Sequence, residues 1–308
     1  MSQTRFPQGI LISCEIPWDD NDQLLEDVFR TEVRTALAAG FKNVYVFGTA
    51  GEGYAVDVPR FQRIVEVFHE ETLAGGQAAH AQVGVIALSV PQFHERLRFA
   101  YDKGFREFQI SLPSWGALND TEVMRFFQDV CLAYPDARFL HYNLMRTKRL
   151  LTARDYRRIA DAVPNLVATK NTGTTVHSTR DLLLHAPDLQ HFFGEGMFPT
   201  GCLFGECSLL SSFGPMFPKA THRFFEYGRT RQWDKLFPYQ AEYLNAVEDV
   251  IEPMRRREMI DGAYDKMLVR LSGIPMPLRL LSPYENFSES IFEECNGILR
   301  TKYAHWLE

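Results

Sequence analysis

The chain has 308 residues, of which 45% are hydrophobic and 23% charged, and its formal net charge is −6. These values are ordinary for a globular protein and leave room for one large α/β barrel or two smaller domains. The acidic balance argues against a nucleic-acid partner. No apolar run approaches the length of a transmembrane helix, and Met1 to Pro7 lack the apolar centre of a signal peptide, so we expect a cytoplasmic protein without a membrane partner.

The cysteines and histidines show no metal-ligand spacing. An odd and scattered set of cysteines predicts reduced thiols. The nine histidines form no pair at helical ligand spacing. The sequence therefore predicts neither a metal site nor an organic cofactor. The cysteines are Cys14, Cys131, Cys202, Cys207 and Cys295.

Short apolar runs alternate with amphipathic stretches along the first three-quarters of the chain. The amphipathic stretches predict helices at 21–39, 58–73, 91–103, 120–134, 152–162, 177–186, 199–204 and 218–229. Eight strand-then-helix units predict an α/β fold, a closed (β/α)8 TIM barrel. The predicted strands are Gly9–Cys14, Asn43–Phe47, Ala79–Val85, Glu107–Leu112, Arg138–Tyr142, Leu166–Lys170, Gln190–Phe193 and Ser208–Ser211.

Local signals at the element ends fit this assignment. Gly40 and Gly104 stand where glycines end helices, Pro59 suits a first helical turn, and Thr152 with Asp155 resembles a capping box. After residue 230 the strand signal is lost, and helices are predicted at 231–251, 257–272 and 286–304. No linker composition precedes them. We therefore expect a barrel over 1–230 and a helical extension over 231–308 that packs on it as one structural unit.

Three strand ends carry groups that suit carbonyl chemistry. Lys170 closes the run 165–170, where desolvation can lower the pKa of its amine and make it a nucleophile for Schiff-base formation. Tyr142 ends the fifth predicted strand, and Thr49 lies in the glycine-rich segment after the second. Because the carboxyl ends of barrel strands form the active-site rim, these groups together predict a carbonyl-binding lyase. The alternative is a lysine that marks a strand end and extends to water.

Taken in order, these motifs resemble the dihydrodipicolinate synthase/N-acetylneuraminate lyase superfamily. The resemblance rests on the loop Gly48-Thr49-Ala50-Gly51-Glu52, the pair Tyr142-Asn143, Lys170 with Thr172, Gly194, and Leu209-Leu210-Ser211. It spans nearly the whole chain. It implies a (β/α)8 barrel with a C-terminal helical extension that acts as a pyruvate-handling class I aldolase or dehydratase, commonly as a homotetramer or dimer.

The resemblance also implies a role for each matching residue. Lys170 would form the imine with a 2-oxo acid, Tyr142 would move protons, and Thr49 would orient Tyr142. The backbone N–H groups of Thr49 and Ala50 would hold the substrate carboxylate. Further residues would line the same pocket, namely Thr172 through its hydroxyl, Leu210 through its carbonyl, and Gly194.

The chain departs from the family pattern at several positions. Ala50 replaces a hydroxyl or glycine, and Met145 stands where a proline is usual. Trp115 ends a segment that replaces the Pro-Tyr-Tyr pattern of dihydrodipicolinate synthases, and Asn171 follows the lysine. These differences argue against dihydrodipicolinate synthase itself and leave the 2-oxo-acid side of the pocket intact.

The second substrate and the reaction stay open at this point. Arg146 either pairs with a substrate carboxylate or is a solvated loop residue. Glu15 either binds a polyol substrate or caps the barrel rim, and Glu195 is a further candidate for binding substrate hydroxyls. Three functions compete: an aldolase that joins or cleaves a 2-oxo acid and an aldehyde, a dehydratase of a deoxy-keto sugar acid that uses the same imine, and a barrel that binds a 2-oxo acid without catalysis.

Overall fold

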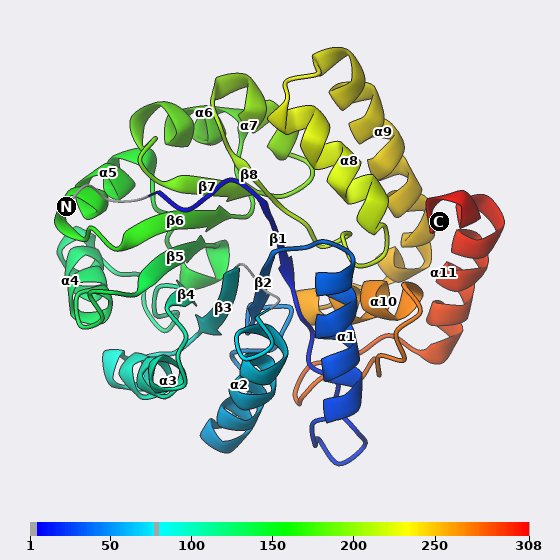
Figure 1. Cartoon of the computed structure of the whole chain (residues 1–308), viewed down its shortest axis with the longest axis horizontal. Coiled ribbons are helices and arrows are strands. Elements are labelled where there is room, and N and C mark those ends of the chain that lie inside the picture. The colour runs from blue at the N-terminus through cyan, green and yellow to red at the C-terminus, as the bar shows by residue number, and fades with distance from the viewer. Residues whose placement is uncertain (1–4, 77–79, 308) are drawn as a thin grey trace.

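The computed structural model describes residues 5–76 and 80–307 and shows a closed barrel of eight parallel strands (Figure 1). The strands pair in chain order, and β8 closes the barrel against β1. Ala79, predicted to begin the third strand, lies outside the described residues, as do the first four residues of the chain. The strands are β1 (Ile10–Ser13), β2 (Asn43–Val46), β3 (His80–Val85), β4 (Glu107–Ile110), β5 (Arg138–Asn143), β6 (Leu166–Asn171), β7 (Gln190–Phe193) and β8 (Ser208–Leu210).

A helix follows every strand, and three more helices come after the barrel. This order confirms the predicted (β/α)8 barrel with a C-terminal helical part. The barrel helices are α1 (Glu26–Ala38), α2 (Val58–Thr72), α3 (Val90–Asp102), α4 (Asp120–Cys131), α5 (Ala153–Ala162), α6 (Val176–His185), α7 (Phe198–Phe204) and α8 (Pro218–Arg229). The additional helices are α9 (Trp233–Val250), α10 (Asp261–Leu271) and α11 (Glu289–Lys302).

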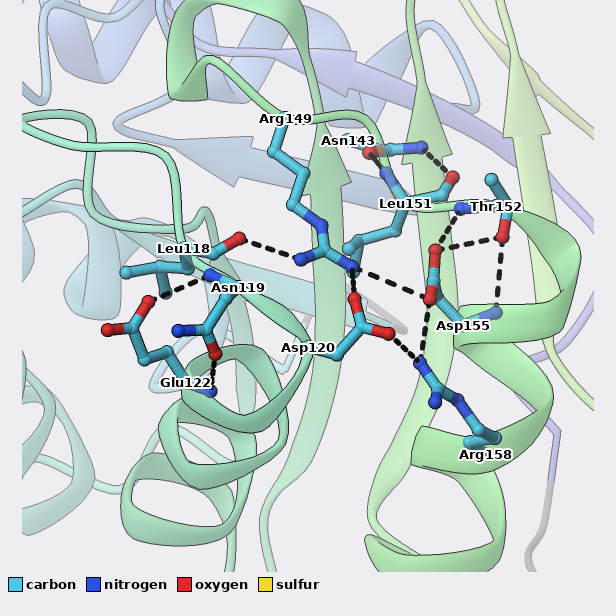
Figure 2. A network of polar contacts seen from close by, with 10 residues as sticks. All are labelled: Leu118, Asn119, Asp120, Glu122, Asn143, Arg149, Leu151, Thr152, Asp155 and Arg158. Carbon is cyan, nitrogen blue, oxygen red and sulfur yellow. Dashed lines mark hydrogen bonds and ion pairs between the residues drawn. The ribbon is translucent and has the colours of Figure 1, made fainter.

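The helix ends follow the local sequence signals. Gly40 and Gly104 adopt φ angles of 89° and 110°, a region in which a side chain would be strained. Thr152 and Asp155 form the reciprocal capping box that starts α5, drawn in Figure 2. Local signals predicted these ends because the groups that satisfy the terminal N–H and C=O groups lie within a few residues of them.

Strand residues alternate between two hydrophobic clusters. In β2, Val44 and Val46 pack in the cluster shared with the surrounding helices, whereas Tyr45 belongs to the cluster inside the barrel. Side chains of neighbouring strands fill that interior, and Phe6 joins them, its backbone N–H donating to the carbonyl of Val167 near the start of β6. Side chains therefore fill the inside of the barrel near the amino-terminal ends of its strands.

A buried ion pair joins the C-terminal helices to the barrel. Lys266 of α10 lies 2.6 Å from Glu52 in the loop after β2, and both side chains are fully buried. The Glu52 carboxylate also accepts from Trp18 Nε1 at 2.8 Å and from the N–H of Leu281 at 2.7 Å. These bonds hold α10 beside the carboxyl ends of the strands, as Figure 1 shows.

Among the described residues no helix is long and apolar enough to cross a membrane.

Candidate active site

The amine of Lys170 lies inside the barrel between two tyrosine rings. Lys170 pairs with Tyr142 in the register of β6 and β5, so both side chains emerge at the same level. Its Nζ lies 3.9 Å from the ring centroid of Tyr142 and 4.3 Å from that of Tyr45. It donates a hydrogen bond of 2.7 Å to the hydroxyl of Tyr45. With 3% of its surface exposed, Lys170 does not extend to water.

Burial brings the pKa of this amine close to neutral pH. Desolvation lowers the pKa of Lys170 from 10.5 to about 7, because the charged ammonium loses its hydration. The carboxyl groups of Asp265, Asp261 and Glu15 oppose this shift by favouring the charged form. A substantial fraction of the amine is therefore neutral at physiological pH, which is the state that attacks a carbonyl carbon.

The phenol of Tyr142 is held by two threonines. Burial raises the pKa of Tyr142, while the hydroxyls of Thr49 and Thr172 act on it as hydrogen-bonding groups and lower that pKa. Thr49 is 3% exposed and comes from the loop after β2, and Thr172 follows β6 directly. The structure therefore brings together Lys170, Tyr142 and Thr49, the three residues to which the sequence assigns the chemistry.

The loop after β2 presents two backbone donors. Within the described part of the chain, the N–H groups of Thr49 and Ala50 donate to no backbone or side-chain acceptor. Gly48 precedes them, and a Cβ there would lie 2.7 Å from the Tyr45 ring, so a glycine is required for the loop to pass over this ring. Paired free N–H groups form a site for an anion such as a carboxylate.

A cavity of about 290 Å³ opens above the amine. Ala50, Thr172 and Leu210 line it, as the sequence predicts, whereas Gly194 does not and its neighbour Glu195 does. The remaining walls come from β2, β5 and β6, from the segment after β8, and from the C-terminal part of the chain. They are formed by Tyr45, Tyr142, Lys170, Ser212, Phe213, Ile251, Met254, Asp261, Tyr264, Asp265 and Leu268.

The loop after β5 is pinned at its base, as Figure 2 shows. The Asn143 side chain accepts from the N–H of Leu151 at 2.9 Å and donates to its carbonyl at 3.0 Å. Arg149 donates to the carbonyl of Leu118 at 2.7 Å and pairs with Asp120 of α4 at 2.6 Å. These contacts fix both ends of the loop, at Asn143 and at Arg149 to Leu151.

Arg146 of this loop is already paired within the protein. Its guanidinium forms two hydrogen bonds, of 3.1 and 2.8 Å, with the carboxylate of Asp261 at the start of α10. Asp261 lines the cavity and Arg146 does not. From the sequence, Arg146 was either a residue that binds a substrate carboxylate or a solvated loop residue. The structure instead places it in an ion pair at the rim of the cavity. Trp115 is 84% exposed and lies outside the cavity lining.

Several cavity residues were missed by the sequence reasoning. Tyr45 could have been found from the alternation of β2, which turns every second side chain into the barrel. Asp261, Tyr264, Asp265 and Leu268 follow the three-and-four spacing of one helix face, but nothing local indicates which face of α10 meets the barrel.

Comparison with known proteins places this arrangement in a family. The family model described as the dihydrodipicolinate synthetase family matches residues 6–302. The chain belongs to this family. The family comprises lyases, among them synthases and N-acetylneuraminate lyases.

The curated relatives are distant. An uncharacterized DapA-like lyase of Thermococcus onnurineus is 20% identical over 95% of this chain and 98% of its own length. The 4-hydroxy-tetrahydrodipicolinate synthase of Thermus thermophilus is 28% identical over 56% of this chain, and the match spans about half of that enzyme, 54% of its length. An N-acetylneuraminate lyase of Salmonella paratyphi B is 22% identical over 64% of this chain and 66% of its own length.

Solved structures share the fold at low identity. YagE, a prophage protein of E. coli K12 in complex with pyruvate, superimposes with a TM-score of 0.84 at 16% identity and covers 95% of this chain and 97% of its own. CdNal of Clostridium difficile in complex with mannosamine gives 0.83 at 15% identity, covering 95% and 98%. At such identities the likeness concerns the barrel and its helical extension.

Proposed function

We propose that this protein is a class I lyase that forms an imine between Lys170 and a 2-oxo acid, with pyruvate as substrate or product. The observation that carries the proposal is the Lys170 amine, buried between two tyrosines with its pKa lowered to about 7. The protonated imine then acts as the electron sink for making or breaking a C–C bond. No other cofactor is needed for this chemistry.

The neighbouring groups supply binding and proton transfer. The free N–H groups of Thr49 and Ala50 take the substrate carboxylate, which places the ketone carbon next to Nζ. Tyr142, held by Thr49 and Thr172, moves the proton to and from the reacting oxygen. The hydroxyl of Thr172 and the region of Leu210 bound the same side of the cavity, and Gly194 leads into Glu195.

The second substrate binds in the outer part of the cavity, which is rich in acceptors. Asp261, Asp265 and Glu195 are carboxyl groups in its lining, and Arg146 is held by Asp261. An anionic aldehyde would have to compete with Asp261 for this guanidinium. We therefore assign this side to an uncharged aldehyde whose hydroxyl groups donate to Asp261, while Arg146 holds that carboxylate in position.

Substitution of Arg146 tests this assignment. Arg146→Ala should weaken binding of the full substrate by about 1.5–3 kcal/mol and leave pyruvate trapping at Lys170 nearly unchanged. Steady-state kinetics with acidic and with neutral hydroxylated aldehydes measure the effect. A loss confined to acidic aldehydes would reverse the assignment, and equal losses for pyruvate would place Arg146 on the wrong side of the cavity.

Borohydride trapping tests the proposed function. Incubation with pyruvate and sodium borohydride should add the reduced ligand to the peptide that carries Lys170, as read by mass spectrometry. Lys170→Met should abolish the adduct, whereas Lys266→Met, a matched change at the other buried lysine, should retain it. An adduct on another peptide, or none with a panel of 2-oxo acids, would refute the imine.

Product analysis separates the competing reactions. Release of pyruvate with an aldehyde identifies an aldolase, which we propose. Loss of water with the carbon chain intact identifies a dehydratase, and binding without turnover identifies a non-catalytic barrel.

We further propose that the protein is cytoplasmic and forms a homo-oligomer, a tetramer or dimer. Light scattering measures the mass of the assembly directly. A monomeric dihydrodipicolinate synthase variant has a similar fold, with a TM-score of 0.82 at 17% identity, so a monomer is the alternative that this measurement tests.

A further inference from the structure

The proposed imine chemistry assigns no role to Glu15, a buried carboxyl group near Lys170. Glu15 follows β1, is 1% exposed and is absent from the cavity lining, so it does not reach a substrate. Within the described residues it forms no ion pair, and its Oε2 has no hydrogen-bond partner. A carboxylate buried without a paired cation destabilises a protein, so its presence calls for a function.

Glu15 lies at one end of a line of polar groups that leads to Lys170. Ser13 pairs with Tyr45 in the register of β1 and β2, so their side chains stand next to each other on the inner face of the barrel. Glu15 is two positions beyond Ser13, just past the end of β1. The hydroxyl of Tyr45 in turn lies 2.7 Å from Lys170 Nζ.

The Ser13 hydroxyl connects the two ends of this line. Ser13 stands beside Tyr45 in the strand register and two positions before Glu15, and its hydroxyl lowers the pKa of both groups. Its Oγ is buried and makes no hydrogen bond of standard geometry in the described structure, so it is free to turn toward either neighbour. Burial raises the pKa of Tyr45, which keeps the phenol protonated and able to pass a proton on.

We propose that Tyr45, Ser13 and Glu15 form a second proton path, separate from Tyr142 and Thr49, that accepts a proton from Lys170 and returns it during imine formation. Tyr45 is a catalytic residue in this scheme because it contacts the reacting nitrogen. Ser13 and Glu15 act through Tyr45. The proposal rests on imine formation at Lys170.

The proton balance of imine formation is complete with this path. The Lys170 ammonium gives one proton to Tyr45, which passes its own through Ser13 to the Glu15 carboxylate. The neutral amine attacks the ketone carbon, forming a C–N bond, and a nitrogen proton moves to the oxygen to give the carbinolamine. The stored proton then returns to that oxygen, the C–O bond breaks, and water leaves the protonated imine.

The energetics suit this exchange. Burial raises the pKa of Glu15 to about 7, and burial lowers that of Lys170 to about 7. Proton transfer between groups of similar pKa is nearly balanced in free energy, which is the condition for efficient relay near neutral pH. The groups that face Glu15 from other elements are Glu32 of α1, Tyr45 of β2, Glu52 of the following loop, Lys170 of β6, and Asp265 and Lys266 of α10.

The test measures how fast the imine forms. Wild-type protein and the variants Tyr45→Phe, Glu15→Gln and Ser13→Ala are mixed with saturating pyruvate at pH 7, quenched with borohydride over time, and the adduct is counted by mass spectrometry. Tyr45→Phe and Glu15→Gln should each slow adduct formation by roughly 10–100-fold. The double variant should be no slower than either single variant, because the groups act in series.

A purely electrostatic role predicts the opposite sign. The Glu15 charge holds the pKa of Lys170 up, so its removal alone would leave more neutral amine and an equal or faster rate. Glu32→Gln is the matched control: it removes a buried carboxyl from the same cluster and keeps an oxygen that can accept from the Glu15 N–H, as Glu32 does at 2.7 Å. Its rate should stay close to wild type.

Three results would overturn the proposal. Wild-type rates in Glu15→Gln and Tyr45→Phe, or a slowing as large in Glu32→Gln, would leave the path without a function while the imine itself stands. No adduct in wild-type protein would reject the imine and the path together. Thermal melting identifies variants that fail to fold, and Ser13→Ala, the smallest change, then decides whether the path is used.

Discussion

Lys170 and Lys266 are the two buried lysines among the described residues, and their amines have different partners. Lys266 is fully buried and bound to the Glu52 carboxylate and to the carbonyl of Arg279, at 2.6 and 2.5 Å. Lys170 is almost as buried, but its one hydrogen bond goes to a neutral tyrosine hydroxyl. Burial lowers the pKa of both amines. The carboxylate of Glu52 contacts the Lys266 ammonium and stabilises its charge. The carboxyl groups near Lys170 do not contact its amine and act on it only through longer-range electrostatics.

The comparison shows what makes a buried lysine reactive. Desolvation acts on both lysines, so it does not explain the difference between them. At Lys266 a direct counterion makes the amine part of a structural ion pair, whereas at Lys170 the lack of one fits the nucleophile that we propose. The rings of Tyr45 and Tyr142 supply packing around Lys170 without supplying a full negative charge.

The largest expected effect is on turnover. Lys170→Ala should abolish turnover, because it removes the atom that bonds to the substrate. Product formation over extended incubation measures this. Lys266→Ala should retain activity in the fraction of molecules that stay folded, as judged by circular dichroism on the same sample. Equal residual activity in both variants would remove the distinction between the two lysines.

The next effect concerns the phenol beside the reactive amine. Tyr142→Phe keeps the ring over Nζ and removes the hydroxyl, so turnover should fall by roughly 10²–10⁴-fold while trapping of pyruvate persists. Single-turnover and steady-state rates compare the two steps. Thr49→Val should give a smaller loss in the same direction. Wild-type turnover in a folded Tyr142→Phe protein would contradict the assignment.

The ion pair of Lys266 should contribute to the free energy of unfolding. Glu52→Gln leaves the Lys266 ammonium buried without its counterion, and the free energy of unfolding should fall by about 3–5 kcal/mol. Chemical denaturation measures it. Lys170→Met should change stability in the other direction, because it removes a desolvated amine that has no ion pair. A loss of stability in Lys170→Met as large as in Glu52→Gln would show that both lysines are structural.

The smallest effect is a dependence on pH. Because the pKa of Lys170 lies near 7, the rate of imine formation should fall about tenfold per pH unit below that value. The same shift makes stability rise with pH between about 7 and 10.5, since the unfolded chain binds the proton more tightly there. Trapping rates and denaturation midpoints across this range measure both. Lys170→Met should lose the stability slope, and Lys266 variants should keep it.

Local sequence determined the elements and the inner half of the site. Alternating apolar runs and helix-end residues such as Gly40 and Thr152 act within a few positions of themselves, so they predicted eight strands and their helices. A parallel barrel gathers the carboxyl ends of all its strands on one rim. Lys170, Tyr142 and Thr49 could therefore be placed together from their strand positions alone.

Tertiary structure decided the partners of these residues. The bond from Lys170 to Tyr45, the pairing of Arg146 with Asp261, and the position of Asp265 in the cavity all join segments far apart in the chain. Strand order fixes the barrel, but the docking of α10 depends on the Lys266–Glu52 pair and on which helix face packs inward. Such contacts produce no periodic pattern in the sequence around each residue. They stabilise the protein only when segments distant in the chain pack together, so the local sequence does not predict them.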